Sequence, residues 1–217
     1  MSHLLVPSRP RLRGVLHHYS FFVSLFMGGA LLALAPSPRA LAVAGIYAAS
    51  LSALLGVSAL YHRVTWSPEA RRWMGRLDHS MINVLIAGTY TPFGVIGVTG
   101  PRSSTLLAAI WIGALANILL HVFWLDAPKW LSAVTYVLLG WIGVVAVPDL
   151  LAHSGWTPTL LLCLGGLIYS MGALVYAFRR PDPIPTVFGY HEVFHALVVV
   201  AALAHYAAVA LTILPPG

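Results

Sequence analysis

The last apolar stretch of this chain, residues 190–213, reads YHEVFHALVVVAALAHYAAVALTI. A stretch of this length can cross a bilayer as a helix, which needs roughly 20 mostly apolar residues. His191 and His195 lie at its start, four residues apart, and therefore share one face of that helix. Two imidazoles on one face can bind a single metal ion, and ionisable groups inside a membrane span usually mark function. The stretch therefore predicts both a membrane helix and a metal site.

Outward from this stretch, the chain contains further apolar segments of similar length, near residues 15–35, 40–62, 80–99, 103–124, 131–151 and 158–178. Of the 217 residues, 59% are hydrophobic and only 8% are charged, whereas soluble domains carry about 25% charged residues. The segments lack a period of two, which favours helices over a membrane barrel. We therefore predict an all-α membrane protein, a seven-transmembrane helix bundle, and exclude a soluble globule.

The connections between the apolar segments are short and leave no room for a separate soluble domain. We predict an N-terminal tail at 1–14, a single seven-helix domain at 15–213 and a C-terminal tail at 214–217. The first segment is followed by further spans, so we interpret it as a helix and not as a cleaved signal. The single cysteine, Cys163, excludes an intrachain disulfide and a cysteine-based zinc cluster.

Basic residues are distributed unequally between the two ends of the expected helices. Only Arg39 and Arg102 lie in the loops after the first, third and fifth spans. The other ten of the 12 lie in the N-terminal tail or in the alternate loops: Arg9, Arg11, Arg13, Arg63, Arg71, Arg72, Arg76, Lys129, Arg179 and Arg180. This bias predicts a cytosolic N-terminus and an outside C-terminus, in the inner (plasma) membrane. Membrane lipids are the expected partners, and the pattern does not indicate nucleic acid.

Polar residues from three spans fall near the expected cytosolic side. Ser58 and His62 lie in the last turns of the second span, Asp78 lies at the entrance of the third, and His191 and His195 begin the seventh. The simplest assembly is a tetrahedral Zn²⁺ held by three histidines with water in the fourth position, the pattern of catalytic zinc. Asp78 would hold that water and accept its proton. Ser58 would bond a ligand or stabilise an oxyanion.

Simpler interpretations exist for the same residues. Asp78 could pair with Arg76 or cap the third helix, and Ser58 could hydrogen-bond within its own helix. His205 lies ten residues beyond His195, about 15 Å along the axis, so a buried hydrogen bond is expected for it instead of the same metal. Interfacial or packed polar roles are expected for His3, His17, His18, His121 and His153.

Four short motifs occur along the chain: SALYH at 58–62, RLD at 76–78, AGTYTP at 87–92, and HEVFH at 191–195 followed by His205-Tyr206. Together they resemble the hemolysin III family, the bacterial branch of the adiponectin and progestin receptor-like seven-helix proteins. The resemblance covers nearly the whole chain. It implies a zinc ion near the cytosolic face, held by His62, His191 and His195, with Asp78 touching the metal through water. Ser58 falls on the family's helix-two serine.

Receptor relatives and the alkaline ceramidases, which are distantly similar, imply hydrolysis of a lipid amide such as ceramide. We therefore expect a zinc-dependent hydrolase of lipid amide or ester bonds, whose substrate enters from the bilayer. A rival interpretation is an intramembrane metalloprotease, because residues 191–195 fit H-E-x-x-H with Glu192 as the base. No acidic residue follows Glu192 to serve as its third ligand. A non-enzymatic alternative is a membrane-homeostasis sensor, receptor or cytolysin with a structural zinc.

Overall fold

The computed structural model describes residues 9–124 and 127–214, and in these ranges helices dominate, with one isolated β-bridge between Ile184 and Phe188. Parts of the two predicted tails, residues 1–8 with His3 and residues 215–217, lie outside the described residues. The elements are α1 (Val15–Ala33), α2 (Pro38–Arg63), α3 (Pro68–Pro92), the π-helical η1 (Phe93–Gly97), α4 (Pro101–Phe123), α5 (Lys129–Trp141), the 3₁₀ helix η2 (Ile142–Ala146), α6 (Val147–His153), α7 (Trp156–Phe178) and α8 (Tyr190–Ile213).

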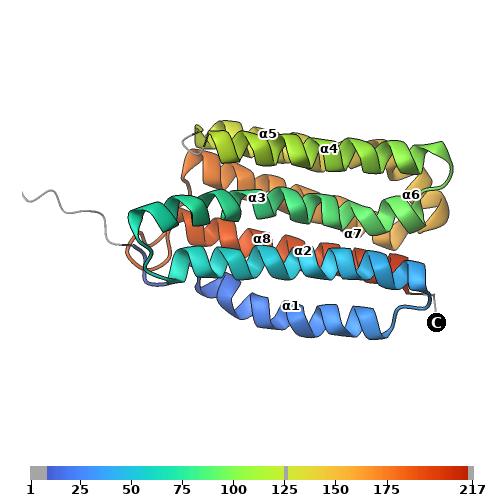
Figure 1. Ribbon diagram of the computed structural model, residues 1–217, viewed down its shortest axis with the longest axis horizontal. Helices are drawn as coiled ribbons and strands as arrows, with labels where there is room; N and C mark the ends of the chain where they lie inside the picture. The colour runs from blue at the N-terminus through green and yellow to red at the C-terminus, as the bar shows by residue number, and fades with distance from the viewer. Residues whose placement is uncertain (1–8, 125–126, 215–217) are drawn as a thin grey trace, which may run out of the picture.

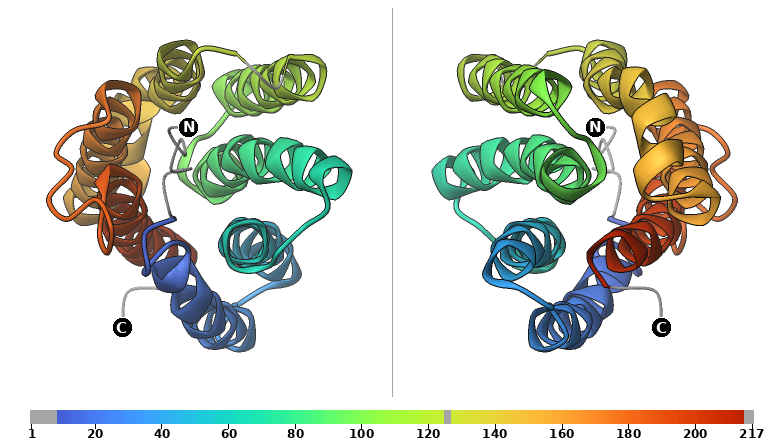
Figure 2. Two further views of the ribbon diagram at one scale, coloured as in Figure 1. Left: turned by 90° about the vertical axis from the view of Figure 1, so that its left-hand side faces the viewer. Right: turned by 90° about the vertical axis from the view of Figure 1, so that its right-hand side faces the viewer.

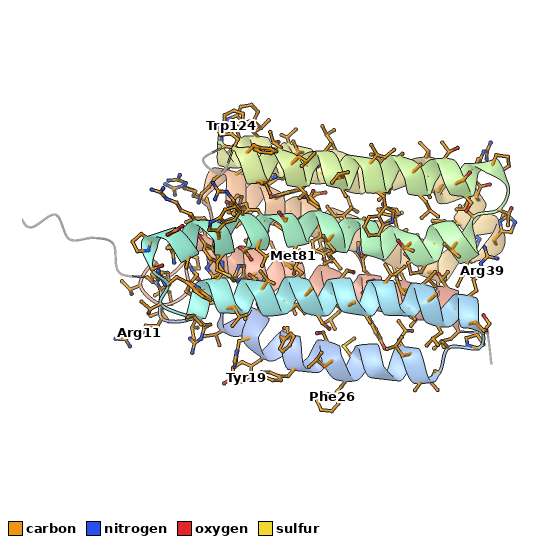
Figure 3. The ribbon with its side chains drawn as sticks, in the orientation of Figure 1. Arg11, Tyr19, Phe26, Arg39, Met81 and Trp124 are labelled. Atoms are coloured by element: carbon orange, nitrogen blue, oxygen red, sulfur yellow. The ribbon has the colours of Figure 1, made fainter. Side chains whose placement is uncertain are left out.

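Seven helical segments in the described part of the chain are long and apolar enough to cross a membrane. Two of them are composite, since α3 continues into η1 and α5 continues through η2 into α6. The segments lie side by side along the length of the molecule (Figure 1). Large apolar side chains point away from the bundle, such as Phe26 on α1, which is 82% exposed (Figure 3). These features confirm the predicted all-α, seven-span, multi-pass membrane protein.

The helices follow one another around a ring (Figure 2). α1 packs along α2, α2 along α3, α3 along α4, and α7 along α8. The ring closes because α8 returns to contact α1 as well as α2 and α3. The first and last helices of the sequence are therefore neighbours, which brings the start of α8 next to the start of α1 and the end of α2.

The third helix begins earlier than the sequence analysis predicted. Its N-cap is Ser67, whose hydroxyl accepts a hydrogen bond from the Ala70 N–H at 3.3 Å. Pro68 and Glu69 then occupy its first turn, and both favour a helix start. The first turns of α3 are rich in charged residues, so the apolar part of this helix begins only after them. Asp78 consequently lies ten residues after Pro68, inside the helix and not at its entrance.

The two ends of the bundle differ in charge. Helices α1, α3, α5 and α8 begin at the end where α2, α4 and α7 finish (Figure 1). We call this the basic end, because it contains the ten basic residues assigned above to the N-terminal tail and the alternate loops. Arg11 lies there and Arg39 lies at the opposite end (Figure 3). His62, His191 and His195 belong to turns at the basic end.

Candidate metal centre and its cavity

Three histidines converge at the basic end. His62 comes from the last turn of α2, and His191 and His195 come from the first turns of α8. One ligand atom from each ring lies within 4.8 Å of the others. The Nε2 atoms of His62 and His191 are 3.2 Å apart. Because residues four apart share a helix face, α8 directs both of its rings toward the one ring supplied by α2.

The donor set and its spacing fit a metal ion. Imidazole nitrogens are ordinary ligands of zinc and of other first-row ions. In a tetrahedral zinc site with Zn–N bonds of about 2.0–2.1 Å, two nitrogens lie roughly 3.3 Å apart, close to the separation of His62 and His191. The Nδ1 of His195 is buried and has no hydrogen-bond partner among the described residues. The three rings can therefore hold a metal ion.

Asp78 and Ser58 lie beside the histidines. The Oδ2 of Asp78 is 3.8 Å from the Nε2 of His62, and Ser58 lines the same cavity as Asp78. The simpler interpretations are not observed in residues 9–124 and 127–214. Arg76 donates to the Val122 carbonyl oxygen at 3.0 Å instead of pairing with Asp78, and the hydrogen bonds found there include none from Ser58 to its own helix.

These groups line one cavity of about 330 Å³ that extends from the basic end into the bundle. Beyond the polar groups its wall is largely apolar, with contributions from Leu54, Ile82, Leu85, Ile86, Val137 and Val198. The lining also includes Tyr169 and His205, which belong to the middle of α7 and α8. A cavity with a few convergent polar groups and an apolar remainder is typical of a small-molecule site, and this one suits an amphiphile.

His205 makes the buried hydrogen bond that the sequence predicted. Its Nε2 donates to the Leu162 carbonyl oxygen at 3.0 Å. A Cβ added at Gly165 would collide with the His205 ring, so α7 and α8 approach closely here because residue 165 is glycine. The hydroxyl of the adjacent Tyr206 donates to the Met27 carbonyl oxygen at 2.8 Å. His205 therefore connects helices and stands apart from the histidine cluster.

His17 contributes to the site in a way that sequence reasoning missed. It was expected to be an interfacial or packed polar residue. It is packed, but its partner is His195: the two rings stack with centroids 3.8 Å apart and planes inclined by 9°. His17 is only 2% exposed and lines the cavity. No signal in the sequence distinguishes His17 from the adjacent His18.

Glu192 lies between two of the clustered histidines in sequence but is engaged elsewhere. Its carboxylate pairs with Arg13 and accepts the Gly189 N–H at 2.9 Å. It is 1% exposed and is not one of the cavity-lining side chains. Backbone hydrogen bonds also join residues 11–12 to residues 186–187. The segment before α1 is thereby tied to the loop before α8, next to the histidine cluster.

The fold and the site define a class: a seven-helix, multi-pass membrane protein with a buried three-histidine cluster beside a carboxylate. The chain belongs to the haemolysin-III related family, whose model matches residues 6–206.

Individual relatives support this assignment. The chain is 32% identical over 170 residues to "Hemolysin-3" of Bacillus cereus, a match that covers 78% of this chain and 74% of the relative. It is 34% identical over 154 residues to "Hemolysin-3 homolog" of Bacillus subtilis, covering 71% and 69%. It is also 31% identical over 169 residues to "Adiponectin receptor protein" of Drosophila melanogaster, covering 70% of this chain and 38% of that protein.

Proposed function

We propose that this protein is a zinc-dependent hydrolase of lipid amide or ester bonds, with Zn²⁺ held by His62, His191 and His195. The observation that carries the proposal is the convergence of three imidazoles beside the Asp78 carboxylate at one end of a mainly apolar cavity. Three protein ligands are the number typical of catalytic zinc, whereas structural zinc is usually closed by four. When bound, the ion would supply Lewis-acid chemistry that polarises a carbonyl and activates water.

Asp78 is the group best placed to move a proton. Its carboxylate would accept a hydrogen bond from the attacking water and take its proton as the water oxygen adds to the carbonyl carbon. It would return that proton to the leaving nitrogen or oxygen as the C–N or C–O bond breaks. Ser58 would orient this carboxylate or donate to the developing oxyanion. The apolar wall would hold the acyl chain and so keep the carbonyl beside these groups.

We also propose that the basic end faces the cytosol and that the protein lies in the inner (plasma) membrane. Ten of the 12 basic residues of the chain lie at that end, which supports this orientation. Residues 15–213 would then form one transmembrane domain whose metal site lies near the cytosolic leaflet. The lipid substrate would enter from the bilayer between helices.

An intramembrane metalloprotease is less well supported. It requires Glu192 as the base, yet Glu192 is engaged by Arg13 and the Gly189 N–H and does not line the cavity. A Glu192→Gln variant separates the two enzymes. The lipid hydrolase should keep turnover per folded molecule within a few-fold, whereas a protease that uses this base should lose nearly all of it.

A receptor, sensor or cytolysin with a structural metal is the second candidate function. It is favoured by the similarity to a protein named adiponectin receptor protein and to proteins named Hemolysin-3. In that case the same three histidines would hold a metal that stabilises the bundle, and no lipid would be turned over.

The test is hydrolysis of fluorescent ceramides and phospholipids by the purified protein in nanodiscs, before and after chelation and zinc return. We expect turnover that chelation removes and zinc restores. Asp78→Asn should lower it by about 10²–10⁴-fold with the zinc content unchanged. Asp149→Asn, the same substitution at the opposite end, is the matched control and should keep full turnover. Zinc-loaded, folded protein that hydrolyses none of these lipids would favour the non-enzymatic candidate.

A further inference from the structure

Three basic side chains line the same cavity as the histidine cluster: Arg13, Arg71 and Lys129. They come from distant parts of the sequence, namely the segment before α1, the first turns of α3 and the start of α5. The cavity therefore has a positively charged mouth at the basic end, directly beside the candidate metal centre.

Aromatic rings hold two of these cations at the cavity wall. The guanidinium carbon of Arg71 lies 5.0 Å from the centre of the Tyr61 ring. The Nζ of Lys129 lies 4.8 Å from the centre of the Tyr176 ring and donates to the Tyr190 hydroxyl oxygen at 2.8 Å. Tyr61, Tyr176 and Tyr190 all line the cavity as well. Such contacts position a cation without neutralising its charge, so both charges can still act on an anion.

Among the described residues, the nearby carboxylates form no ion pair with Arg71 or Lys129. Glu192 is engaged by Arg13. Asp78 has His62 as its nearest basic neighbour, at 3.8 Å, and the ion pairs of the described residues do not join it to Arg71. The Nη1 of Arg71 is buried with no hydrogen-bond partner among those residues. A buried charged donor without an acceptor is destabilising, so an anion that accepts from Arg71 would stabilise this arrangement.

We propose that Arg71 and Lys129 bind the anionic headgroup, a phosphate or carboxylate, of a lipid whose acyl chain occupies the apolar part of the cavity. A guanidinium presents parallel N–H donors that match two oxygens of such a group, and the Lys129 ammonium adds a second charge. The headgroup would lie at the mouth, and the chain would run along Leu54, Ile82 and Val198. In this arrangement the amide or ester bond that joins the acyl chain to the headgroup lies beside the histidines and Asp78.

The proposed function is needed only to say which bond of the lipid is cleaved. Binding of the headgroup does not depend on it, because binding requires no turnover. It narrows the substrate class from lipid amides and esters in general to anionic amphiphiles. A neutral ceramide would leave the buried Nη1 of Arg71 without an acceptor, so it should bind less well than an anionic lipid with the same chain.

The experiment compares two lipids with one acyl chain, a 1-acylglycerol 3-phosphate and the neutral 1-monoacylglycerol, binding to the full chain in zwitterionic nanodiscs at physiological salt. We expect the wild type to bind the phosphate lipid about tenfold more tightly. Arg71→Gln and Lys129→Gln should each remove most of that preference. Arg72→Gln is the matched control, since Arg72 is the exposed neighbour of Arg71 and does not line the cavity. Circular dichroism and size-exclusion elution establish that each variant is folded.

Three results would overturn the proposal. One is equal binding of the two lipids by the wild type, and another is a loss of preference in Arg72→Gln as large as in Arg71→Gln, which indicates general surface electrostatics. The third is displacement of the lipid by low millimolar inorganic phosphate, together with an affinity for phosphate alone that equals the affinity for the phosphate lipid. This result would assign the site to free phosphate. Hydrolysis measured in parallel separates the two proposals. If the preference persists while no lipid is hydrolysed, the anion site stands and the hydrolase does not.

Discussion

Helix α8 contains two buried histidines whose surroundings differ. His195, at the basic end, is 2% exposed, stacks on His17, and has a buried Nδ1 without a partner in the part of the chain that the structure describes. His205, ten residues further on, is 8% exposed, and its Nε2 donates to the Leu162 carbonyl oxygen. Burial therefore does not distinguish a structural histidine from a candidate ligand. Position does, because His195 lies within reach of His62 and His191, whereas His205 lies ten residues further along the helix.

The two ends of the bundle also differ in how deeply their ion pairs are buried. Arg13 and Glu192 pair at the basic end with side chains 22% and 1% exposed. Arg102 and Asp149 pair at the opposite end at 3.3 Å, with side chains 74% and 20% exposed. The buried pair fixes the segment before α1 against the start of α8, whereas the other lies at the surface. The basic end thus combines the candidate metal ligands with the contacts that hold them in place.

Removal of the carboxylate from each ion pair should give the largest difference in stability between variants at the two ends. Glu192→Ala leaves Arg13 without its partner and the Gly189 N–H without its acceptor. We expect a loss of about 3–5 kcal/mol in the free energy of unfolding, against less than about 1 kcal/mol for Asp149→Ala. Denaturant unfolding of both variants in one detergent measures this. Equal losses would show that the pair at the basic end is not structurally distinct.

A methyl group added beside His205 should have an intermediate effect. Gly165→Ala places a Cβ against the His205 ring, and such overpacking destabilises by about 1–3 kcal/mol. Gly29→Ala, in α1, meets open space and is the matched control, which should be neutral or slightly stabilising. Thermal unfolding compares the two. Metal content per folded molecule should stay at the wild-type value in both, and a loss of metal in Gly165→Ala would contradict the separation of His205 from the cluster.

The stack of His17 on His195 should have the smallest measurable effect. An aromatic pair contributes about 0.5–1.5 kcal/mol beyond its buried area, so His17→Ala should weaken metal affinity roughly two- to tenfold. His17→Phe keeps a flat ring against His195 and should stay close to wild type. His18→Ala, at the exposed neighbouring position, is the control. Competition with a chromogenic chelator gives the affinities, and identical values for His17→Ala and His18→Ala would show that the stack does not support the ligand ring.

Much of the fold and part of the site could be predicted from the sequence. Long apolar stretches specify membrane helices because backbone groups in lipid must bond within the segment. The alternating direction of consecutive spans then placed His62 and His191 at the same end, which the structure also shows. The early start of α3 was readable too, because Ser67, Pro68 and Glu69 form a recognisable helix start.

Other features were not predictable from a single sequence. A span that is apolar on every side does not show which face turns inward, so nothing indicated that His17 and not His18 would enter the site. Arg13 and Glu192 are 179 residues apart, and no local pattern connects them. Glu192 instead fitted a protease motif in the sequence, and only the folded chain shows its carboxylate engaged elsewhere.

The most direct test of the three-histidine metal site is the metal content of the purified, folded protein, measured by inductively coupled plasma mass spectrometry in the wild type, His195→Ala and His205→Ala. We expect about one zinc per chain in the wild type, the same content in His205→Ala, and little or none in His195→Ala. Folded wild-type protein that takes up no metal when zinc is supplied, or a His195→Ala variant that keeps its zinc, would contradict this expectation.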